Sequence, residues 1–347
     1  TEREAIERAW FERIVQGCIA LHRVHAERDE VTGKHLSLGV VRVANVDPCI
    51  QLTRYLLDGA LPDDIEIRVM SYHARQVLLL RSEQENHLGQ VLNRKHGKKP
   101  QDHLKIKEHL QQATKPHVIF ILVATPVEEV GRDHDLDWAV IEPSSMRSII
   151  QMAGRVWRHR PIQEDLKPNI LLLERNLASL LNKTETQPAF YHPGYESKAY
   201  LLNSHSLKDL VDEPSLANKL DAAPRIQAAN PLKPHEALAD LEHQVLQDVL
   251  LKAHYSPALV QGWLHCAYYL TRMAQQATPF RDSDKDSNFK LHLTDDEQLL
   301  LRFPEEDGKQ GKEAANLHIE TLPEGLRKRL WLPLDYADLI ASYSQIR

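Results

Sequence analysis

Apolar residues recur at spacings of three and four along residues 5–26, which predicts an amphipathic helix with one buried stripe. The stripe consists of Ile6, Trp10, Ile14, Cys18, Leu21 and Val24. After Gly33 the pattern changes to short β-branched or wholly apolar runs, which alternate with helical stretches. These runs predict five strands, at residues 36–43, 65–71, 118–124, 138–141 and 169–173. The alternation indicates an α/β fold with a parallel sheet of βαβ units.

The run at residues 118–124, VIFILVA, has no polar position. A parallel strand that is covered on both faces requires such a run, so this strand is expected inside the sheet. After the fourth strand, Ser144 or Ser145 can cap a helix that is predicted to run to about His159.

Residues 94–115 interrupt the alternation and hold basic side chains around Gly97 and Pro100, namely Arg94, Lys95, Lys98, Lys99, Lys105 and Lys107. The segment is either a solvated surface insertion or a loop that contacts phosphates. No aromatic residue is interleaved for base stacking, which favours the surface insertion.

The βα alternation stops at about Leu181. Residues 183–235 are rich in Pro, Asn and Ser and are interpreted as a long connector. An apolar-periodic helix at 238–251 begins a second, mostly helical unit. The predicted organisation is therefore a sheet domain at 1–182, a linker at 183–235 and a C-terminal domain at 236–347.

The length of 347 residues accommodates about two domains, and the net charge of −6 requires any nucleic-acid contact to come from local basic patches. Three widely separated cysteines, Cys18, Cys49 and Cys266, indicate a reducing cytoplasm without disulfides. No apolar run approaches the ~18 residues of a membrane span, so a cytoplasmic protein without a membrane partner is expected. Nineteen histidines suggest metal, but no converging set of ligands is visible, and no metal site is predicted.

Two segments follow strands at the edge where ligands of parallel sheets bind. Residues 125–133 come after the apolar run, and residues 151–158 lie on the predicted helix. There Gln151, Arg155 and Arg158 have the spacing i, i+4 and i+7 and are expected on one face. Paired guanidinium groups suit phosphate oxygens, although for the helix alone a solvated basic face that pairs with carboxylates is the better explanation.

The two segments together, Thr-x-x-x-Glu-x-Gly-x-Asp and then Gln-x-x-Gly-Arg-x-x-Arg, resemble motifs V and VI of superfamily-two helicases. Both motifs belong to the second RecA-like domain of those motors, so the resemblance implies a RecA-like sheet domain. It implies that Thr125 contacts the nucleic-acid backbone and that Gly131 and Asp133 lie near the ATP ribose. The chain departs from the family pattern at Pro126, where Gln is usual, and at Met152, where Arg is common.

The resemblance also implies roles for the remaining motif residues. Arg155 and Arg158 would be arginine fingers that stabilise charge on the γ-phosphate. Gln151 would couple them to the partner domain, and Glu129 would link the ATP site to the nucleic-acid site.

The flanking sequence is closer to one group, the helicase–nuclease of type I CRISPR systems, with subtype I-F as the best match. The resemblance rests on Arg81 and on residues 72–75 (YHAR), 153–160 (AGRVWRHR), 191–196 (YHPGYE) and 224–226 (PRI). It implies a motor that an RNA-guided surveillance complex recruits, and that reels in and degrades single-stranded DNA in the 3′-to-5′ direction. His73 and Arg75 would touch DNA phosphates, with the C-terminal domain over the strand channel. The alternative for these two residues is a strand-end turn with a surface ion pair.

Parts of such a motor are missing. Thr32-Gly33-Lys34 lacks the glycine and the hydroxyl of a phosphate-binding loop, and Asp212-Glu213 follows no apolar strand. His134-Asp135 spells a metal-dependent nuclease dipeptide but has no partners. We expect ATP and Mg²⁺ to be shared with a first RecA-like domain, in an N-terminal half outside this chain. Alone, the chain is predicted neither to hydrolyse ATP nor to cut DNA.

Two other functions remain open. One is a helicase fragment from DNA repair or RNA metabolism. The other is a non-catalytic module that binds a partner complex or a phage anti-CRISPR inhibitor. In the C-terminal unit, Trp263, Tyr268 and Tyr269 could stack bases but are interpreted as core residues, and residues 280–282 are a possible contact point.

Overall fold

The computed structural model describes residues 1–161, 167–182, 184–217, 220–252, 259–267, 289–294, 296, 298–304, 311–314 and 322–344. The chain divides into two compact units. The first comprises Thr1–Leu246 with Lys328–Leu332, and the second comprises Gln247–Arg327 with Pro333–Arg347. The sequence-based domain limits at 182 and 235 remain a prediction.

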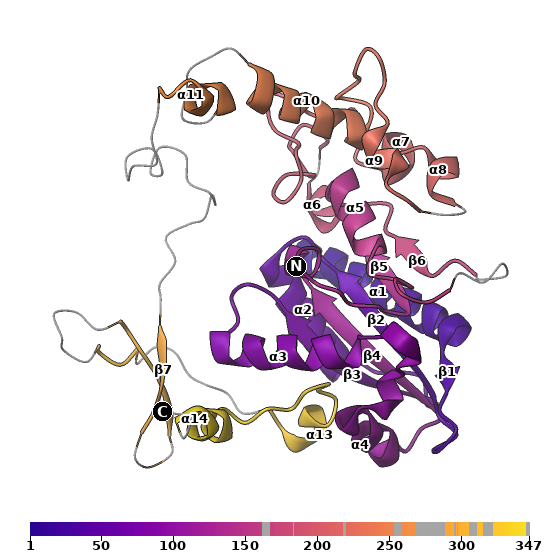
Figure 1. The fold of residues 1–347 in the computed structure, drawn as a ribbon, viewed down its shortest axis with the longest axis vertical. Coiled ribbons are helices and arrows are strands. Elements are labelled where there is room, and N and C mark those ends of the chain that lie inside the picture. The colour runs from indigo at the N-terminus through magenta and orange to yellow at the C-terminus, as the bar shows by residue number, and fades with distance from the viewer. Residues whose placement is uncertain are drawn as a thin grey trace. The chain divides into compact units, whose positions relative to one another are not determined.

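The first unit is built on a parallel sheet, as the strand–helix alternation predicts (Figure 1). Its strands are β1 (Glu27–Arg28), β2 (His35–Arg42), β3 (Ile65–Tyr72), β4 (His117–Ala124), β5 (Trp138–Ile141) and β6 (Ile170–Leu172). The order is β3-β4-β2-β5-β6, and the neighbours in this path run parallel. Only the two-residue β1 is antiparallel, and it pairs with β2. The predicted α/β fold with a parallel sheet is confirmed.

Strand β4 lies inside the sheet, between β3 and β2, and its apolar run is buried. Alternate side chains point to opposite faces of a strand. Val118, Phe120 and Leu122 accordingly join one hydrophobic cluster. The intervening Ile119, Ile121 and Val123 join the other. Helices therefore cover both faces of β4, which explains why the run has no polar position.

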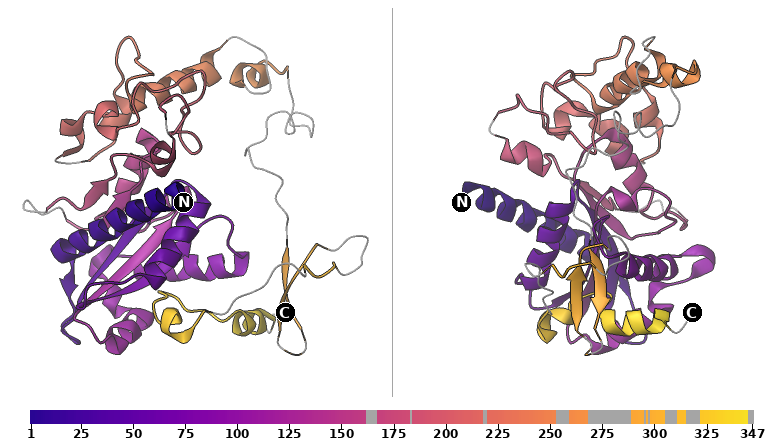
Figure 2. Two further views of the ribbon diagram at one scale, coloured as in Figure 1. Left: turned by 180° about the vertical axis from the view of Figure 1, so that it is seen from behind. Right: turned by 90° about the vertical axis from the view of Figure 1, so that its left-hand side faces the viewer.

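Helices α1 (Glu2–His25), α2 (Val46–Asp58) and α6 (Leu177–Leu181) contribute to one of these clusters. Helices α3 (Leu78–Val91), α4 (Leu104–Gln112) and α5 (Met146–Ala153) contribute to the other. The long α1 lies across its face of the sheet (Figure 2, indigo), and Trp10, Phe11 and Ile14 are its buried stripe. Thr1 and Glu4 form a capping box that begins the helix.

The basic segment after α3 contains two short 3₁₀ turns, η1 (Lys95–Gly97) and η2 (Pro100–Asp102), and then α4. It is not solvated throughout. Ile106 and Leu110 of α4 are buried, and the first basic residue, Arg94, is only 5% exposed. The segment thus closes one end of the core.

Residues 184–217 and 220–235, expected to be part of a connector, pack as part of the first unit. They contain α7 (Leu207–Leu210), α8 (Glu213–Ala217) and α9 (Ala223–Ile226), and α10 (Leu238–Leu251) follows. Phe190, Leu202 and Leu207 are buried. The buried carboxylate of Glu196 stabilises the loop, because it accepts hydrogen bonds from the backbone N–H groups of residues 189, 190 and 202 and lies 2.9 Å from His205 Nε2.

A C-terminal segment extends the sheet at β3. Val69 donates a backbone hydrogen bond to Arg329, and Trp331 donates one back to Val69, while Leu330 forms a parallel bridge with Val69. Trp331 is fully buried, and its carbonyl oxygen lies 2.7 Å from His109 Nε2. An apolar segment more than 250 residues away in the chain thereby covers one edge of the sheet.

The second unit contains α11 (Val260–Leu264), a hairpin of β7 (Lys290–Leu293) and β8 (Leu299–Arg302), α13 (Glu324–Arg327) and α14 (Tyr336–Ser344). The hairpin adds strands to a unit that was expected to be mostly helical. Trp263 lies half-buried in α11. Tyr268, Tyr269 and residues 280–282 lie outside the described residues. None of the helices that the structure describes has the length and apolar character of a membrane span.

Candidate nucleotide and nucleic-acid site

Thr125 and His73 follow paired strands, so they lie side by side. Tyr72 and Ala124 are register partners at the carboxyl ends of β3 and β4, and the Thr125 N–H donates to the Tyr72 carbonyl at 3.1 Å. Thr125 is 5% exposed and His73 is 6% exposed. The structure thus brings together two of the three residues expected to contact DNA.

The third, Arg75, lies in the turn after β3 with 61% of its side chain exposed, and Asp47 Oδ1 is 3.7 Å from its Nη1. An ion pair on the surface of a strand-end turn is what the alternative to a DNA contact predicted for Arg75. The turn itself is fixed by Gln76, whose side chain accepts from the His73 N–H and donates to the Ser71 carbonyl. His73 Nδ1 is buried and has no hydrogen-bond partner among the described residues. Burial, with the nearby charge of Arg75, lowers the pKa of His73, so its imidazole is neutral near pH 7.

Glu129 is the centre of a buried network between the loop after β4 and the end of β2. Its carboxylate lies 2.8 Å from Arg42 Nε, and both side chains are almost fully buried. Arg42 also donates to the Glu142 carbonyl at 2.8 Å and to Ser144 Oγ at 2.7 Å. Burial raises the pKa of Glu129, and the charge of Arg42 opposes the rise. The sequence analysis missed Arg42, whose only signal was a charge at the end of an apolar strand.

The helix that carries Gln151 is shorter than predicted. It was expected to run to about His159, but α5 ends at Ala153. Residues 155–157 leave the helix for the strand side: the Arg155 carbonyl accepts from the Leu136 N–H at 2.8 Å, and the Trp157 N–H donates to the Leu136 carbonyl at 2.9 Å. Trp157 adopts φ of 51°. The expected single face of Gln151, Arg155 and Arg158 is therefore wrong.

Arg155 still reaches the loop after β4. Its Nη2 donates to the Glu129 carbonyl oxygen at 2.8 Å, while its Nε is buried without a partner in the described part of the chain. Burial, and then the charge of Arg158, lowers the pKa of Arg155, although the group stays protonated in proteins. Glu129 thus binds Arg42 through its carboxylate and Arg155 through its backbone.

Asp133 holds the second arginine. Arg158 Nε donates to Asp133 Oδ1 at 2.9 Å, His159 Nε2 lies 2.9 Å from the same oxygen, and Lys95 Nζ pairs with Oδ2. Asp133 remains half exposed. The hydrogen bond from Lys95, followed by that from His159, holds the pKa of Asp133 well below its usual range. Gly131, two residues before, has φ of +70° and no atom near the position of a Cβ, so the loop turns there in the left-handed conformation.

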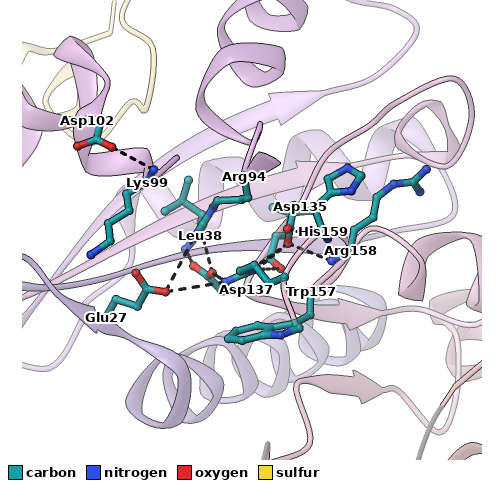
Figure 3. A network of polar contacts seen from close by, with 12 residues as sticks. Glu27, Leu38, Arg94, Lys99, Asp102, Asp135, Asp137, Trp157, Arg158 and His159 are labelled. Carbon is teal, nitrogen blue, oxygen red and sulfur yellow. Dashed lines mark hydrogen bonds and ion pairs between the residues drawn. The ribbon is translucent and has the colours of Figure 1, made fainter. Parts of the chain in front are cut away.

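Two buried aspartates anchor the loop after α5 to the start of β5 (Figure 3). Asp135 accepts from the backbone N–H groups of Arg158 and His159 and from the Arg160 side chain. Asp137 accepts from Arg160 at 2.7 Å, and the sequence analysis assigned a function to neither carboxylate.

Asp137 also accepts from Arg94 at 2.9 Å and from the Leu38 N–H at 2.7 Å. Together the two aspartates fix the backbone that presents Arg158.

The dipeptide His134-Asp135 has structural contacts. His134 Nδ1 lies 2.6 Å from the buried Glu128 Oε1, and Asp135 belongs to the anchor just described. Within the described ranges, no group of three or more His, Cys, Asp or Glu side chains is placed to hold a metal ion.

Comparison with known proteins shows what these loops are similar to. Residues 35–161 match the family model described as CRISPR-associated nuclease/helicase Cas3, C-terminal. The chain is 37% identical over 324 residues to the CRISPR-associated nuclease/helicase Cas3 subtype I-F/YPEST of Pseudomonas aeruginosa, which covers 92% of this chain and 29% of that protein. It is 36% identical over 301 residues to the protein of the same name from Pectobacterium atrosepticum, covering 84% of this chain and 27% of that protein.

A solved structure of T. fusca Cas3 with ATP is 18% identical with a TM-score of 0.30, covering 45% of this chain and 16% of that one. The chain spans less than a third of the length of the curated relatives that it matches. The resemblance drawn from the motifs is confirmed, including subtype I-F.

Proposed function

We propose that the chain, whose residues 35–161 match the family model described as CRISPR-associated nuclease/helicase Cas3, C-terminal, supplies the second RecA-like domain and C-terminal domain of an ATP-dependent helicase–nuclease. The complete motor would translocate 3′ to 5′ on single-stranded DNA and degrade foreign DNA in CRISPR interference. An N-terminal half would supply the phosphate-binding loop, the Mg²⁺ ligands and the nuclease. A cytoplasmic, RNA-guided surveillance complex would recruit the motor, and phage anti-CRISPR inhibitors would be possible partners.

The observation that carries this proposal is the junction of the two loops. Arg155 donates to the Glu129 backbone, and Arg158 binds Asp133. If Thr125 contacts nucleic acid and Arg155 stabilises the γ-phosphate, as the motifs imply, contact between the two loops would couple the two sites.

The residues present suit a nucleotide phosphate. Arg155 Nε is a buried donor without a partner in the described part of the chain. Arg158 is bound to a half-exposed carboxylate, which a phosphate could replace at modest cost. Bound ATP would supply the phosphoryl group whose transfer drives translocation. Gly131, with open space beside it, would let the ribose approach Asp133.

The DNA contacts would lie at the carboxyl ends of β3 and β4. Thr125, His73 and Arg75 follow these ends, and Glu129 follows Thr125 in the same loop. A shift of this loop on DNA binding would move the Glu129 carbonyl and with it Arg155. Gln151, half-buried on α5, would contact the N-terminal half.

The test is ATP turnover by the complete motor with Arg155→Ala. Loss of an arginine finger should lower the rate constant by about 10³-fold or more, equivalent to roughly 4 kcal/mol of transition-state stabilisation. Arg54→Ala, an exposed arginine on α2, is the matched control and should retain full activity. ATP turnover within twofold of the unaltered motor would exclude the proposed role and favour a non-catalytic interaction module. By itself, the unaltered chain should show no turnover.

A further inference from the structure

Three polar side chains, two on α5 and one just after its end, each have an unpartnered buried atom. These atoms are Arg147 Nε, Gln151 Oε1 and Arg155 Nε, which have no hydrogen-bond partner in the described part of the chain. The residues are spaced by four, so Arg147 and Gln151 lie on one face of the helix. Gln151 and Arg155 belong to the motif discussed above, whereas Arg147 does not.

The surroundings of Arg147 leave its guanidinium group available. Glu242 is the nearby buried carboxylate, but its Oε1 accepts from the Arg147 backbone N–H at 2.9 Å and its Oε2 pairs with Arg225 at 3.7 Å. The guanidinium group instead lies over the Tyr195 ring, 5.6 Å from the centroid. Neither contact is an ion pair of the Arg147 guanidinium group, although its charge acts on Glu242 from a longer distance.

Arg147 lies in a cluster of arginines and buried carboxylates, and its charge acts on both Glu129 and Glu242. The charges acting most strongly on Glu129 are those of Arg42, Arg147 and Arg155. Arg42 uses its donors on Glu129, the Glu142 carbonyl and Ser144. The nearby carboxylates already have other partners, Glu129 in Arg42 and Glu242 in Arg225 and the Arg147 backbone. Arg147 and Arg155 each keep an Nε donor without a partner in the described residues, and guanidinium donors of this kind suit an anion with several acceptor oxygens.

The position of Arg147 selects the kind of anion. It lies in the first turn of α5, which begins directly after the carboxyl end of β5. Arg155 follows eight residues later, beyond the end of the helix at Ala153. Thr125 follows the carboxyl end of β4, and β4 and β5 flank β2. Arg147 thus follows the carboxyl end of β5, as Thr125 follows that of β4, at the same edge of the sheet.

We propose that Arg147 is an additional DNA-binding residue, whose guanidinium group binds a backbone phosphate of single-stranded DNA beside the Tyr195 ring. This inference rests on the proposed function, because it extends the DNA contacts from β3 and β4 to β5. The loop that carries Tyr195 packs closely against the residues that precede α5. A Cβ on Gly194 would come within 2.2 Å of the Ser144 carbonyl oxygen, so only glycine permits this approach of the loop to the start of α5.

The experiment measures binding of a fluorescein-labelled oligothymidylate to the purified chain by fluorescence anisotropy over a salt series. Arg147→Gln should weaken binding about tenfold at low salt, and should reduce the slope of log K against log salt by about 0.7, as expected for one lost phosphate contact on a single strand. Arg147→Lys should preserve the slope, because it retains the charge. Arg54→Gln removes one exposed positive charge elsewhere and should leave the slope unchanged.

Three outcomes would overturn the inference, each differently. If the unaltered protein binds DNA and Arg147→Gln has the same slope and affinity, Arg147 does not bind DNA, while the proposed function of the chain still stands. Weaker binding of a fluorescent ADP analogue, with DNA binding unchanged, would assign the phosphate to the nucleotide. Absence of DNA binding by the unaltered chain would remove the proposed function and this inference together. Thermal unfolding of each variant separates loss of fold from loss of contact, since a merely structural Arg147 would shift the melting temperature and leave the slope unchanged.

Discussion

Glu129 and Asp133 lie four residues apart in one loop, and each is joined to an arginine of the segment after α5. Glu129 is 3% exposed and contacts Arg155 through its backbone. Asp133 is half exposed and contacts Arg158 through its carboxylate. Burial raises the pKa of Glu129, whereas the hydrogen bond from Lys95 lowers the pKa of Asp133. The same kind of residue is thus held in two opposite electrostatic environments.

The difference separates a fixed connection from an exchangeable one. A buried ion pair is costly to break, because each charge loses its compensation away from water. A half-exposed pair can exchange its partner for water or a phosphate at little cost. We therefore propose that Glu129 transmits changes between the two sites, and that Asp133 and Arg158 rearrange when nucleotide binds.

The largest expected effect comes from breaking the fixed connection. Arg42→Met would leave the Glu129 carboxylate buried and unpaired, and should lower the free energy of unfolding by about 3–5 kcal/mol. Urea denaturation followed by tryptophan fluorescence measures this loss. The double variant Arg42→Met with Glu129→Gln should recover part of it, since no unpaired charge remains. A loss below about 1 kcal/mol for the single variant, the magnitude of an exposed pair, would erase the distinction between the two carboxylates.

Much of the fold was predictable from the sequence, and so were the two carboxylates compared above, but not their partners. Apolar runs such as that of β4 report burial on both faces directly, so the parallel sheet followed from local pattern. The loop residues Glu129 and Asp133 were identified because the spacing of their motif is local too. The partners of these residues were not: Arg42 and Lys95 lie 87 and 38 residues away, and no local pattern indicates which side chain a carboxylate will meet.

Long-range pairing also explains the errors. The helix of Gln151 was extended past Ala153 because its spacing suited a helix. The backbone of residues 155–157 instead pairs with Leu136, and that alternative is visible only once β5 is in place. Likewise, nothing near Trp331 in the sequence indicates that it completes the core at β3.

A smaller effect is expected at Gly131, which joins the two halves of the loop. Its φ of +70° is matched by Gly97, with φ of +75°, and a Cβ at either position would meet no neighbour. Alanine should therefore cost each site only the left-handed backbone energy, about 1–2 kcal/mol in unfolding free energy. The two variants should differ in the complete motor, where Gly131→Ala should raise the KM for ATP several-fold and Gly97→Ala should leave it unchanged. Equal KM values would show that the loop turn contributes to stability alone.

The smallest effect is the pH dependence of the two carboxylates, which should have opposite signs. The pKa of Asp133 is lowered in the fold, so its contribution to stability is present above about pH 4 and disappears as the pH falls below that value. The pKa of Glu129 is raised, so its contribution is complete below about pH 4 and decreases as the pH rises through the folded-state pKa.

Unfolding free energies of Asp133→Asn and Glu129→Gln, each subtracted from that of the unaltered chain across this range, separate the two. The Asp133 difference should grow with pH but stay under about 1 kcal/mol, because solvent screens a half-exposed pair. The Glu129 difference should shrink with pH. If the two differences change with pH in the same direction, the two carboxylates share one kind of environment. The distinction between a fixed contact at Glu129 and an exchangeable one at Asp133 would then be wrong.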